Sequence, residues 1–159
     1  MEKKVFGYPK FDESGEMILT TYENEYRDML MDIRVYKLEK NQTKIFTSDD
    51  EEIAALLLNG KIEINVDGIE KIVSRKSVFL EGPYAGHVSH SKIISVKALE
   101  ETEILVQKTK NKVTFKSKLY TPEDAPWKYS SQGWYGNVAN RRVNTIIDHD
   151  IEPKSNMVL

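Results

Sequence analysis

Apolar and polar residues alternate with a period of two along much of the chain. The alternation is regular over residues 31–36 and 61–66 and weaker over residues 94–99. Successive side chains of a β-strand point to opposite faces of its sheet, so this period predicts half-buried antiparallel strands.

Short turn signals separate these runs. The dipeptides Asn-Gly at 59–60 and Asp-Gly at 67–68 accept the positive φ angles of tight hairpins, which predicts strands at 61–67 and 69–73. The weakly helical window 49–58 is better explained as a loop leading into a strand, because it ends at a hairpin signal. Strands at this spacing indicate a sandwich, jelly roll or barrel.

The composition changes from about residue 120 onward. Prolines and glycines interrupt this part of the chain, and aromatic residues are crowded there. We expect one domain over residues 1–159, with a barrel at about 17–110 and a long C-terminal excursion at about 118–159. The aromatic residues of the excursion are Trp127, Tyr129, Trp134 and Tyr135.

Composition excludes several classes of function. A chain of 159 residues is long enough to form one hydrophobic core. Its 23 basic and 25 acidic residues give a net charge of −2, which argues against a nucleic-acid partner. The absence of cysteine excludes thiolate metal sites and cysteine nucleophiles. The longest apolar run, residues 53–58, is too short to cross a membrane, and no signal peptide is evident. We therefore expect a cytoplasmic protein without a membrane partner.

Residues 53–68 resemble the centre of a cupin, where a strand, a glycine turn and a returning strand follow one another. Further motifs resemble the first half of the bacterial 5-deoxy-glucuronate isomerases of inositol breakdown. These motifs are Arg75-Lys-Ser-Val-Phe79, Gly82-Pro-Tyr84, Lys92-Ile-Ile-Ser-Val-Lys-Ala98, Tyr120-Thr-Pro-Glu-Asp124 and Gly136-Asn-Val-Ala-Asn-Arg-Arg-Val143.

This resemblance implies an all-β fold, the cupin double-stranded β-helix or jelly-roll barrel. Enzymes of that family are bicupins and intramolecular oxidoreductases that interconvert aldose-type and ketose-type sugar acids. Their metal-binding cluster belongs to the second barrel, which begins just after the position that Leu159 occupies here. The chain is thus expected to correspond to an amino-terminal half, with a second cupin barrel or another subunit as its partner. The related ketol-isomerase of pectin breakdown shares the architecture and stays an alternative.

The resemblance also locates the divalent metal of a catalytic cupin. Its glutamate would stand seven residues before Gly60, at Ile53, and its first two histidines would fall near Thr47 and Asp49. None of the three positions carries the ligand, so we expect no metal or other cofactor in this chain and a divalent metal only in a second barrel.

The histidines of the chain do not replace this set. His87 and His90 are three residues apart, so one strand would direct them to opposite faces. We expect His87 to be a surface or hydrogen-bonded residue. His149 lies in a polar loop, and although composition leaves a Ser-His-Asp arrangement open, no nucleophile elbow is present.

Two charged stretches have simple explanations. Residues 49–52 are all acidic, but they lack the spaced ligands of a calcium loop and are expected to form a solvated loop. Lys108, Lys110 and Lys112 would share one face of a strand, as an anion or RNA patch or as protection of an exposed edge strand. We favour edge protection.

Arg141 and Arg142 are the candidate substrate-binding residues. A guanidinium group can hold a carboxylate through two parallel hydrogen bonds, and the resemblance implies a sugar-acid ligand. The alternative role is a salt bridge that connects the excursion to the barrel. The aromatic residues of the excursion could stack on a sugar, but we expect them to anchor an interface with the second barrel or another subunit.

These observations leave three functions to compare. The first is a metal-free structural barrel that supports a sugar-acid aldose–ketose isomerase, in which case this chain alone is not catalytic. The second is a stand-alone module that binds a small ligand such as a sugar acid. The third is a protein-interaction domain whose aromatic excursion is the docking surface.

Overall fold

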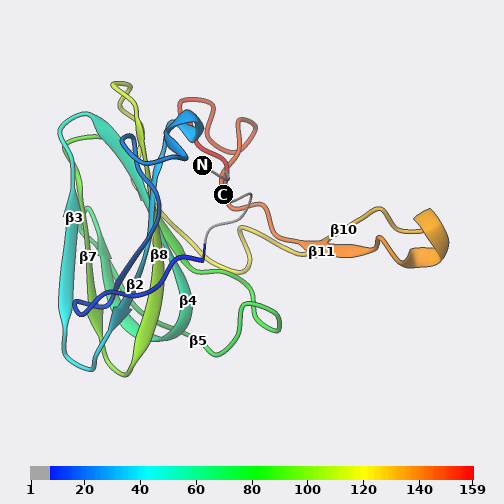
Figure 1. Cartoon of the computed structure of the whole chain (residues 1–159), viewed down its shortest axis with the longest axis horizontal. Helices are drawn as coiled ribbons and strands as arrows, with labels where there is room; N and C mark the ends of the chain where they lie inside the picture. Colours follow the sequence, from blue (N-terminus) through cyan, green and yellow to red (C-terminus); the bar gives the residue numbers. More distant parts are fainter. Residues whose placement is uncertain (1–7) are drawn as a thin grey trace, which may run out of the picture.

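The computed structural model describes residues 8–159 and is built almost entirely of antiparallel strands (Figure 1). The strands are β1 (Glu16–Thr20), β2 (Asp32–Leu38), β3 (Thr43–Thr47), β4 (Glu51–Val66), β5 (Ile69–Arg75), β6 (Ala85–Val88), β7 (Ile93–Ala98), β8 (Thr102–Lys110), β9 (Lys118–Tyr120), β10 (Lys128–Ser130) and β11 (Arg141–Val143). The 3-10 helices η1 (Arg27–Met29) and η2 (Trp134–Asn137) complete the elements of this part of the chain. Neither helix is long and apolar enough to cross a membrane.

Strands β1 to β9 form two sheets that enclose a barrel. One sheet has the order β1-β2-β8-β4-β6-β9, and the other joins β3 to β7, β7 to β4 and β4 to β5. The long strand β4 belongs to both sheets: its first part pairs with β8 and β6, and its second part with β7 and β5. This two-sheet antiparallel arrangement is a jelly roll.

A bulge in the middle of β4 stands where the sequence predicted a hairpin. The register with β8 shifts between Leu57 and Asn59, and the strand continues to Val66 instead of reversing. Gly60 has a φ of 104°, and a Cβ atom there would lie 2.3 Å from Thr102 Oγ1. The prediction of a turn at 59–60 is therefore wrong, because the bulge uses the positive φ that the glycine allows.

The bulge also changes which positions of β4 face the barrel interior. Before it the odd-numbered residues face inward, and after it the even-numbered ones do. The inward residues are Ile53, Ala55 and Leu57 before the bulge and Ile62, Ile64 and Val66 after it.

The hairpin predicted at 67–68 is confirmed. Asp67 and Gly68 have φ angles of 50° and 93° and connect β4 to β5, with Val66 opposite Ile69. Positive φ at both central residues gives the turn a twist that matches the flanking strands.

Apolar side chains fill the barrel interior. Gly86 of β6 permits close packing there, because a Cβ atom at this position would lie 2.7 Å from a methyl carbon of Val66. The most deeply buried members of this core are Leu38, Ile53, Ala55, Leu57, Ile62, Ile64, Val66, Val88, Ile94, Val96, Ala98, Ile104 and Val106.

A second, smaller core lies on the outer side of the first sheet. It forms where the C-terminal part of the chain covers β4, β6 and β9, and the backbone of Leu159 exchanges hydrogen bonds with Ile147. Its buried members are Ala54, Ala85, Tyr120, Ala125, Ile146, Ile147 and Met157.

Residues 127–143 form a slender arm that extends away from the barrel (Figure 1). Its two strands, β10 and β11, pair with each other, with Lys128 opposite Val143 and Ser130 opposite Arg141. Helix η2 lies at the tip, where Tyr135 adopts a left-handed φ of 49°. The arm therefore has little support from the barrel along most of its length.

Candidate functional site

The positions at which a catalytic cupin would hold its metal carry apolar or exposed residues. Ile53 is fully buried and faces the interior. Val88, which lies opposite Ile53 in the pairing of β4 with β6, is also fully buried. Thr47 and Asp49 are exposed. Residues 8–159 contain no group of three or more His, Asp or Glu side chains that could hold a metal. The interior around Ile53 and Val88 offers hydrocarbon where a divalent ion would need nitrogen or oxygen ligands.

Charged side chains border this apolar interior on β1, β2 and β3. Arg34 donates two hydrogen bonds of 2.7 Å to the carboxylate of Asp32 and one of 2.5 Å to Glu16. The hydrogen bonds to Asp32 raise the pKa of Arg34 despite its partial burial. The Nζ atom of Lys44 lies 4.1 Å from the ring centre of Tyr36 and 4.0 Å from Glu16. Most of these charges are thus engaged with one another.

Lys108 differs from its charged neighbours because it has no acceptor among the described residues. It follows Ile104 and Val106 on the barrel face of β8, is half-buried, and lies opposite Asp32 on β2 and Ile53 on β4. Strand β8 lies between β2 and β4, so the interpretation of these lysines as protection of an edge strand is wrong. The amino group of Lys108 is therefore free to interact with an anion at the border of the interior.

Lys110, at the end of β8, belongs to the rim of the barrel. Its Nζ atom lies 2.6 Å from a carboxylate oxygen of Asp50, and this contact raises the pKa of Lys110 and lowers that of Asp50. The same Nζ lies 5.4 Å from the ring centre of Tyr22. Burial, with the nearby carboxylate of Glu51, raises the pKa of Tyr22.

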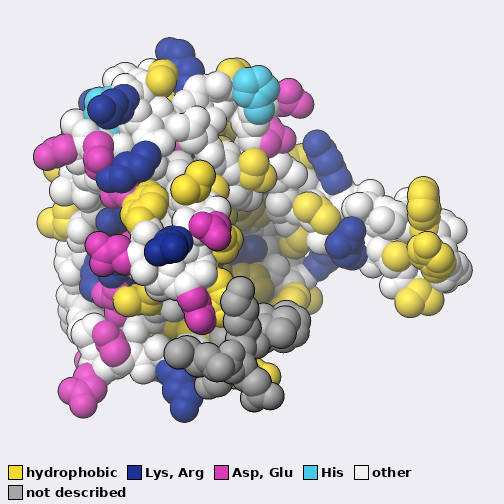
Figure 2. Space-filling model, turned by 45° about the horizontal axis from the view of Figure 1, so that its top comes forward, with side chains coloured by type: hydrophobic (Ala, Val, Ile, Leu, Met, Phe, Trp, Pro, Cys, Tyr) yellow, Lys and Arg dark blue, Asp and Glu magenta, His cyan; other side chains and the backbone are white. Residues whose placement is uncertain are grey.

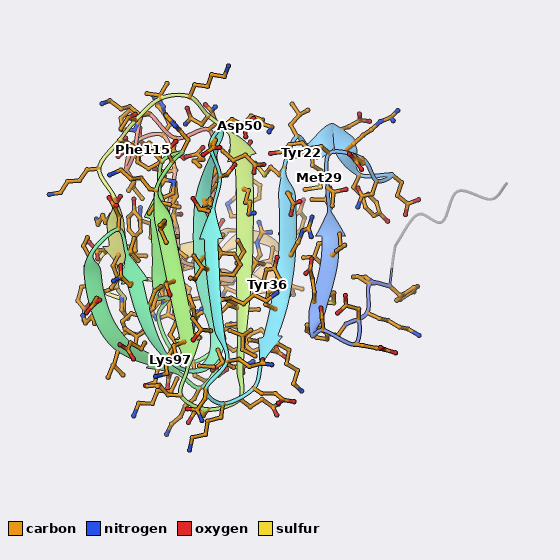
Figure 3. All side chains as sticks on the ribbon, turned by 90° about the vertical axis from the view of Figure 1, so that its left-hand side faces the viewer. Tyr22, Met29, Tyr36, Asp50, Lys97 and Phe115 are labelled. Carbon is orange, nitrogen blue, oxygen red and sulfur yellow. The ribbon has the colours of Figure 1, made fainter. Side chains whose placement is uncertain are left out.

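A cleft of about 550 Å³ opens beside this rim, under η1. Figure 3 labels Tyr22 and Met29, which lie close together where β2 and η1 meet the top of the barrel. The cleft is lined by Tyr22, Met29, Leu30, Met31, Thr109, Lys110 and Asn156.

A buried histidine–carboxylate pair lies on the outer face of the same sheet. His87 Nε2 is 3.0 Å from Glu52 Oε2, and both side chains are almost completely inaccessible to solvent. The second oxygen of Glu52 accepts a hydrogen bond of 2.6 Å from the backbone N–H of Asn156. The ring of Phe115 covers His87 at a centroid distance of 4.6 Å. The pair joins β4, β6 and the C-terminal segment, and it does not face the barrel interior.

Part of this arrangement could be predicted from the pattern of residues. His87 is hydrogen-bonded, as expected, but it is buried rather than at the surface. The assignment of residues 49–52 to a solvated loop is wrong for Glu51 and Glu52, because both belong to β4 and Glu52 is buried. The useful signal was the alternation of Glu52 and Ala54 with Ile53, which places the carboxylate on the face opposite the interior.

The remaining histidines lie apart from this pair. His90 is half-buried near Ser91 and Thr114, whose hydroxyl oxygens are 3.3 and 3.4 Å from its ring nitrogens. His149 is exposed in a turn. His87, His90 and His149 therefore do not converge on one point.

Arg141 and Arg142 lie on β11 in the arm, outside the barrel. Arg142 donates a hydrogen bond to the backbone carbonyl of Phe79 and stacks over the ring of Trp127 at 4.0 Å. Arg142 thereby connects the arm to the loop between β5 and β6. The structure does not bring either arginine together with Lys108.

The predicted aromatic anchors have different surroundings. Trp127 is half-buried under Arg142, whereas Tyr129, Trp134 and Tyr135 are exposed. Figure 2 shows hydrophobic side chains gathered at the end of the arm and Lys or Arg side chains nearer its base.

The sequence is 29% identical over 142 residues to the 5-deoxy-glucuronate isomerase of Geobacillus kaustophilus (strain HTA426). The aligned region covers 86% of this chain and 49% of that relative. The corresponding protein of Geobacillus thermodenitrificans (strain NG80-2) gives the same values. The chain thus spans about half the length of the curated relatives it matches.

Solved structures share the fold. A crystal structure of an IolB-like protein from Salmonella typhimurium LT2 has a TM-score of 0.64 at 18% identity and covers 76% of this chain and 45% of its own. Protein YlbA from E. coli has a TM-score of 0.60 at 10% identity and covers 89% of this chain and 54% of its own. With the strand order, these similarities confirm the predicted cupin jelly roll. The sequence matches the KduI/IolB family over residues 7–159, and the chain belongs to that family.

Proposed function

We propose that this chain is a metal-free structural barrel that supports a sugar-acid aldose–ketose isomerase of inositol breakdown, acting on 5-deoxy-glucuronate. Membership of the KduI/IolB family and the similarity to proteins named 5-deoxy-glucuronate isomerase support an isomerase-family cupin. The observation that carries the supporting role is the pair of buried apolar residues, Ile53 and Val88, at the centre of the interior.

The chemistry of the reaction explains why this pair matters. An aldose–ketose conversion moves a proton between neighbouring carbons, which requires a metal or an acid–base group in contact with the substrate. The core side chains packed with Ile53 are hydrocarbon, and the inward-facing carboxylate of Asp32 is held by Arg34. This part of the interior therefore supplies no ligand set and no carboxylate that is available as a base.

The catalytic metal is then expected in a second cupin barrel. About half the length of the curated relatives lies outside the region that matches this chain, which leaves room for such a barrel. The role of this chain would be to hold that barrel in place, in one polypeptide or as a separate subunit.

Metal content and turnover test this proposal. The purified chain, loaded with Zn²⁺ or Mn²⁺ and then dialysed, is expected to retain no stoichiometric metal by elemental analysis and to leave 5-deoxy-glucuronate unconverted. The Geobacillus kaustophilus relative, assayed in parallel, is the positive control, and the sugar acid of the pectin pathway is a second substrate. Turnover by this chain alone, or one tightly held ion per chain, would overturn the supporting role.

One observation favours a second candidate function, a module that binds a small anionic ligand. Lys108 lacks an acceptor among the described residues and borders the interior, where its half-buried ammonium group would attract a carboxylate. A sugar acid is the ligand class that the family suggests.

Thermal shift assays separate the two candidates. A ligand that binds only the folded chain raises its melting temperature, so stabilisation by a sugar acid that disappears in Lys108→Met would favour the binding module. The matched control is Lys112→Met, because Lys112 is exposed beyond the end of β8. If no sugar acid raises the melting temperature, the result counts against the binding module and favours the supporting role.

A further inference from the structure

The end of the arm presents a compact apolar surface. Trp134 is 66% exposed, Tyr135 82% and Val138 89%, and the two aromatic rings lie 6.4 Å apart. Large aromatic residues with few internal contacts are typical anchors of protein interfaces. Such a surface is expected to be covered by a partner.

The charge of the arm restricts the chemistry of that partner. Residues 127–143 include Lys128, Arg141 and Arg142 but no aspartate or glutamate. Lys128 and Arg141 form no ion pair with any residue in the range 8–159. A matching surface therefore combines an apolar socket with carboxylates at its rim.

The cleft under η1 offers the apolar part of such a surface. Met29 and Leu30 are 54% and 69% exposed, and methionine side chains adapt readily to an inserted ring. A volume of about 550 Å³ is sufficient for an indole ring.

The segments that carry the lining of this cleft are acidic. Residues 21–32 contain four acidic residues and one basic residue, Arg27, and residues 49–52 are all acidic. Glu23, Asp28 and Asp49 are exposed and form no ion pair within the described part of the chain. These carboxylates carry the charge opposite to that of the arm, and Lys110, the basic residue among the described residues that line the cleft, is paired with Asp50.

The arm and the cleft of one copy do not meet. The arm extends away from the barrel, while η1 lies against the top of the barrel (Figure 1). Figure 3, viewed from the side opposite the arm, shows Tyr22 and Met29 at the upper edge. Two copies related by a twofold axis could each insert an arm into the cleft of the other, which is a closed and self-complementary arrangement.

We propose that the arm docks into the η1 cleft of a second copy of this chain, with Trp134 and Tyr135 in the cleft and the basic residues of the arm near Asp28 and Asp49. This contact between the arm and the cleft would form whether or not the chain is catalytic. It is a dimer interface that residues from both copies complete.

Light scattering after size exclusion, over a range of protein concentrations, tests the proposal. The wild-type chain is expected at twice the monomer mass, and Trp134→Ala/Tyr135→Ala is expected to weaken association by about 30-fold or more, as for an interface anchor. Met29→Arg adds a positive charge to the cleft and is expected to weaken association to a similar extent. Ile45→Ala, an exposed apolar residue on the outer face of β3, is the control and should not change the mass.

Mixing the variants identifies the contact itself. The arm variant keeps an intact cleft and Met29→Arg keeps an intact arm, so an equimolar mixture is expected to associate more strongly than either variant alone. If the wild-type chain is monomeric at all concentrations, the proposal is wrong and the arm would instead contact a different protein. Association that survives either the arm variant or Met29→Arg would also overturn it, because the arm and the cleft would not be the contacting surfaces.

Discussion

The substitution Glu52→Ala tests the role of the buried pair most directly. It removes both acceptors at once, leaving His87 Nε2 and the N–H of Asn156 without partners in a site closed to solvent. Removing one member of a buried, hydrogen-bonded pair costs about 3–5 kcal/mol. For a chain of this size, that corresponds to a fall in melting temperature of roughly 10 °C.

Urea unfolding followed by circular dichroism gives the free energy of unfolding of each variant. Glu52→Gln is expected to be less damaging than Glu52→Ala, because its amide oxygen can still accept the hydrogen bond from Asn156. Hydrogen exchange adds a local measurement: the amide of Asn156 should exchange faster in Glu52→Ala than in the wild-type chain.

The matched control is Asp50→Ala, two residues away. Asp50 also forms a short ion pair, with Lys110, but both side chains are about half exposed, so its removal is expected to change stability little. If Glu52→Ala and Asp50→Ala were equally mild, the argument that burial gives the Glu52–His87 pair its importance would be refuted.

Three further predictions concern other parts of the chain. Gly60→Ala should lower the free energy of unfolding by about 2–4 kcal/mol, because the alanine would have a positive φ and would clash with Thr102. Gly68→Ala has open space around it and should lower the free energy of unfolding by about 1 kcal/mol. Urea unfolding compares the two variants. The Ser117 hydroxyl lowers the pKa of Asp67 from its ordinary value of 3.8, so this carboxylate stabilises the fold above that pH and loses its effect as pH falls through the lowered pKa. Ser117→Ala should raise that pKa in an NMR titration; an unchanged value would contradict the assignment. Arg142→Ala should loosen the base of the arm, seen as a shifted tryptophan emission and faster proteolysis within the arm, and identical digestion rates would count against this.

Local pattern was enough to predict the inward face of the second part of β4. Residues 61–66 alternate without interruption, and Ile62, Ile64 and Val66 are the buried members, as the period requires. The Asp-Gly turn was equally local, because its geometry depends on two residues that tolerate positive φ. The Asn-Gly pair failed because a bulge satisfies the same conformational preference within a continuous strand.

Features that depend on distant residues were not accessible from the sequence. Alternation placed Lys108 and Lys110 on one face, but only the pairing of β8 with β2 and β4 shows that the strand is central. Glu52 is buried because the chain returns 104 positions later to place the N–H of Asn156 against it. An acidic run cannot reveal such a contact, so its apparent solvation was a reasonable but incorrect interpretation.

The bulge in β4 makes the length of this strand a constraint on the whole barrel. Deleting or inserting one residue between Leu57 and Ile62 would turn Ile62, Ile64 and Val66 toward water and bring Lys61, Glu63 and Asn65 into the hydrocarbon interior. Related chains are therefore expected to vary in length in the loop between β1 and β2 or in the arm, while the spacing across the middle of β4 stays constant.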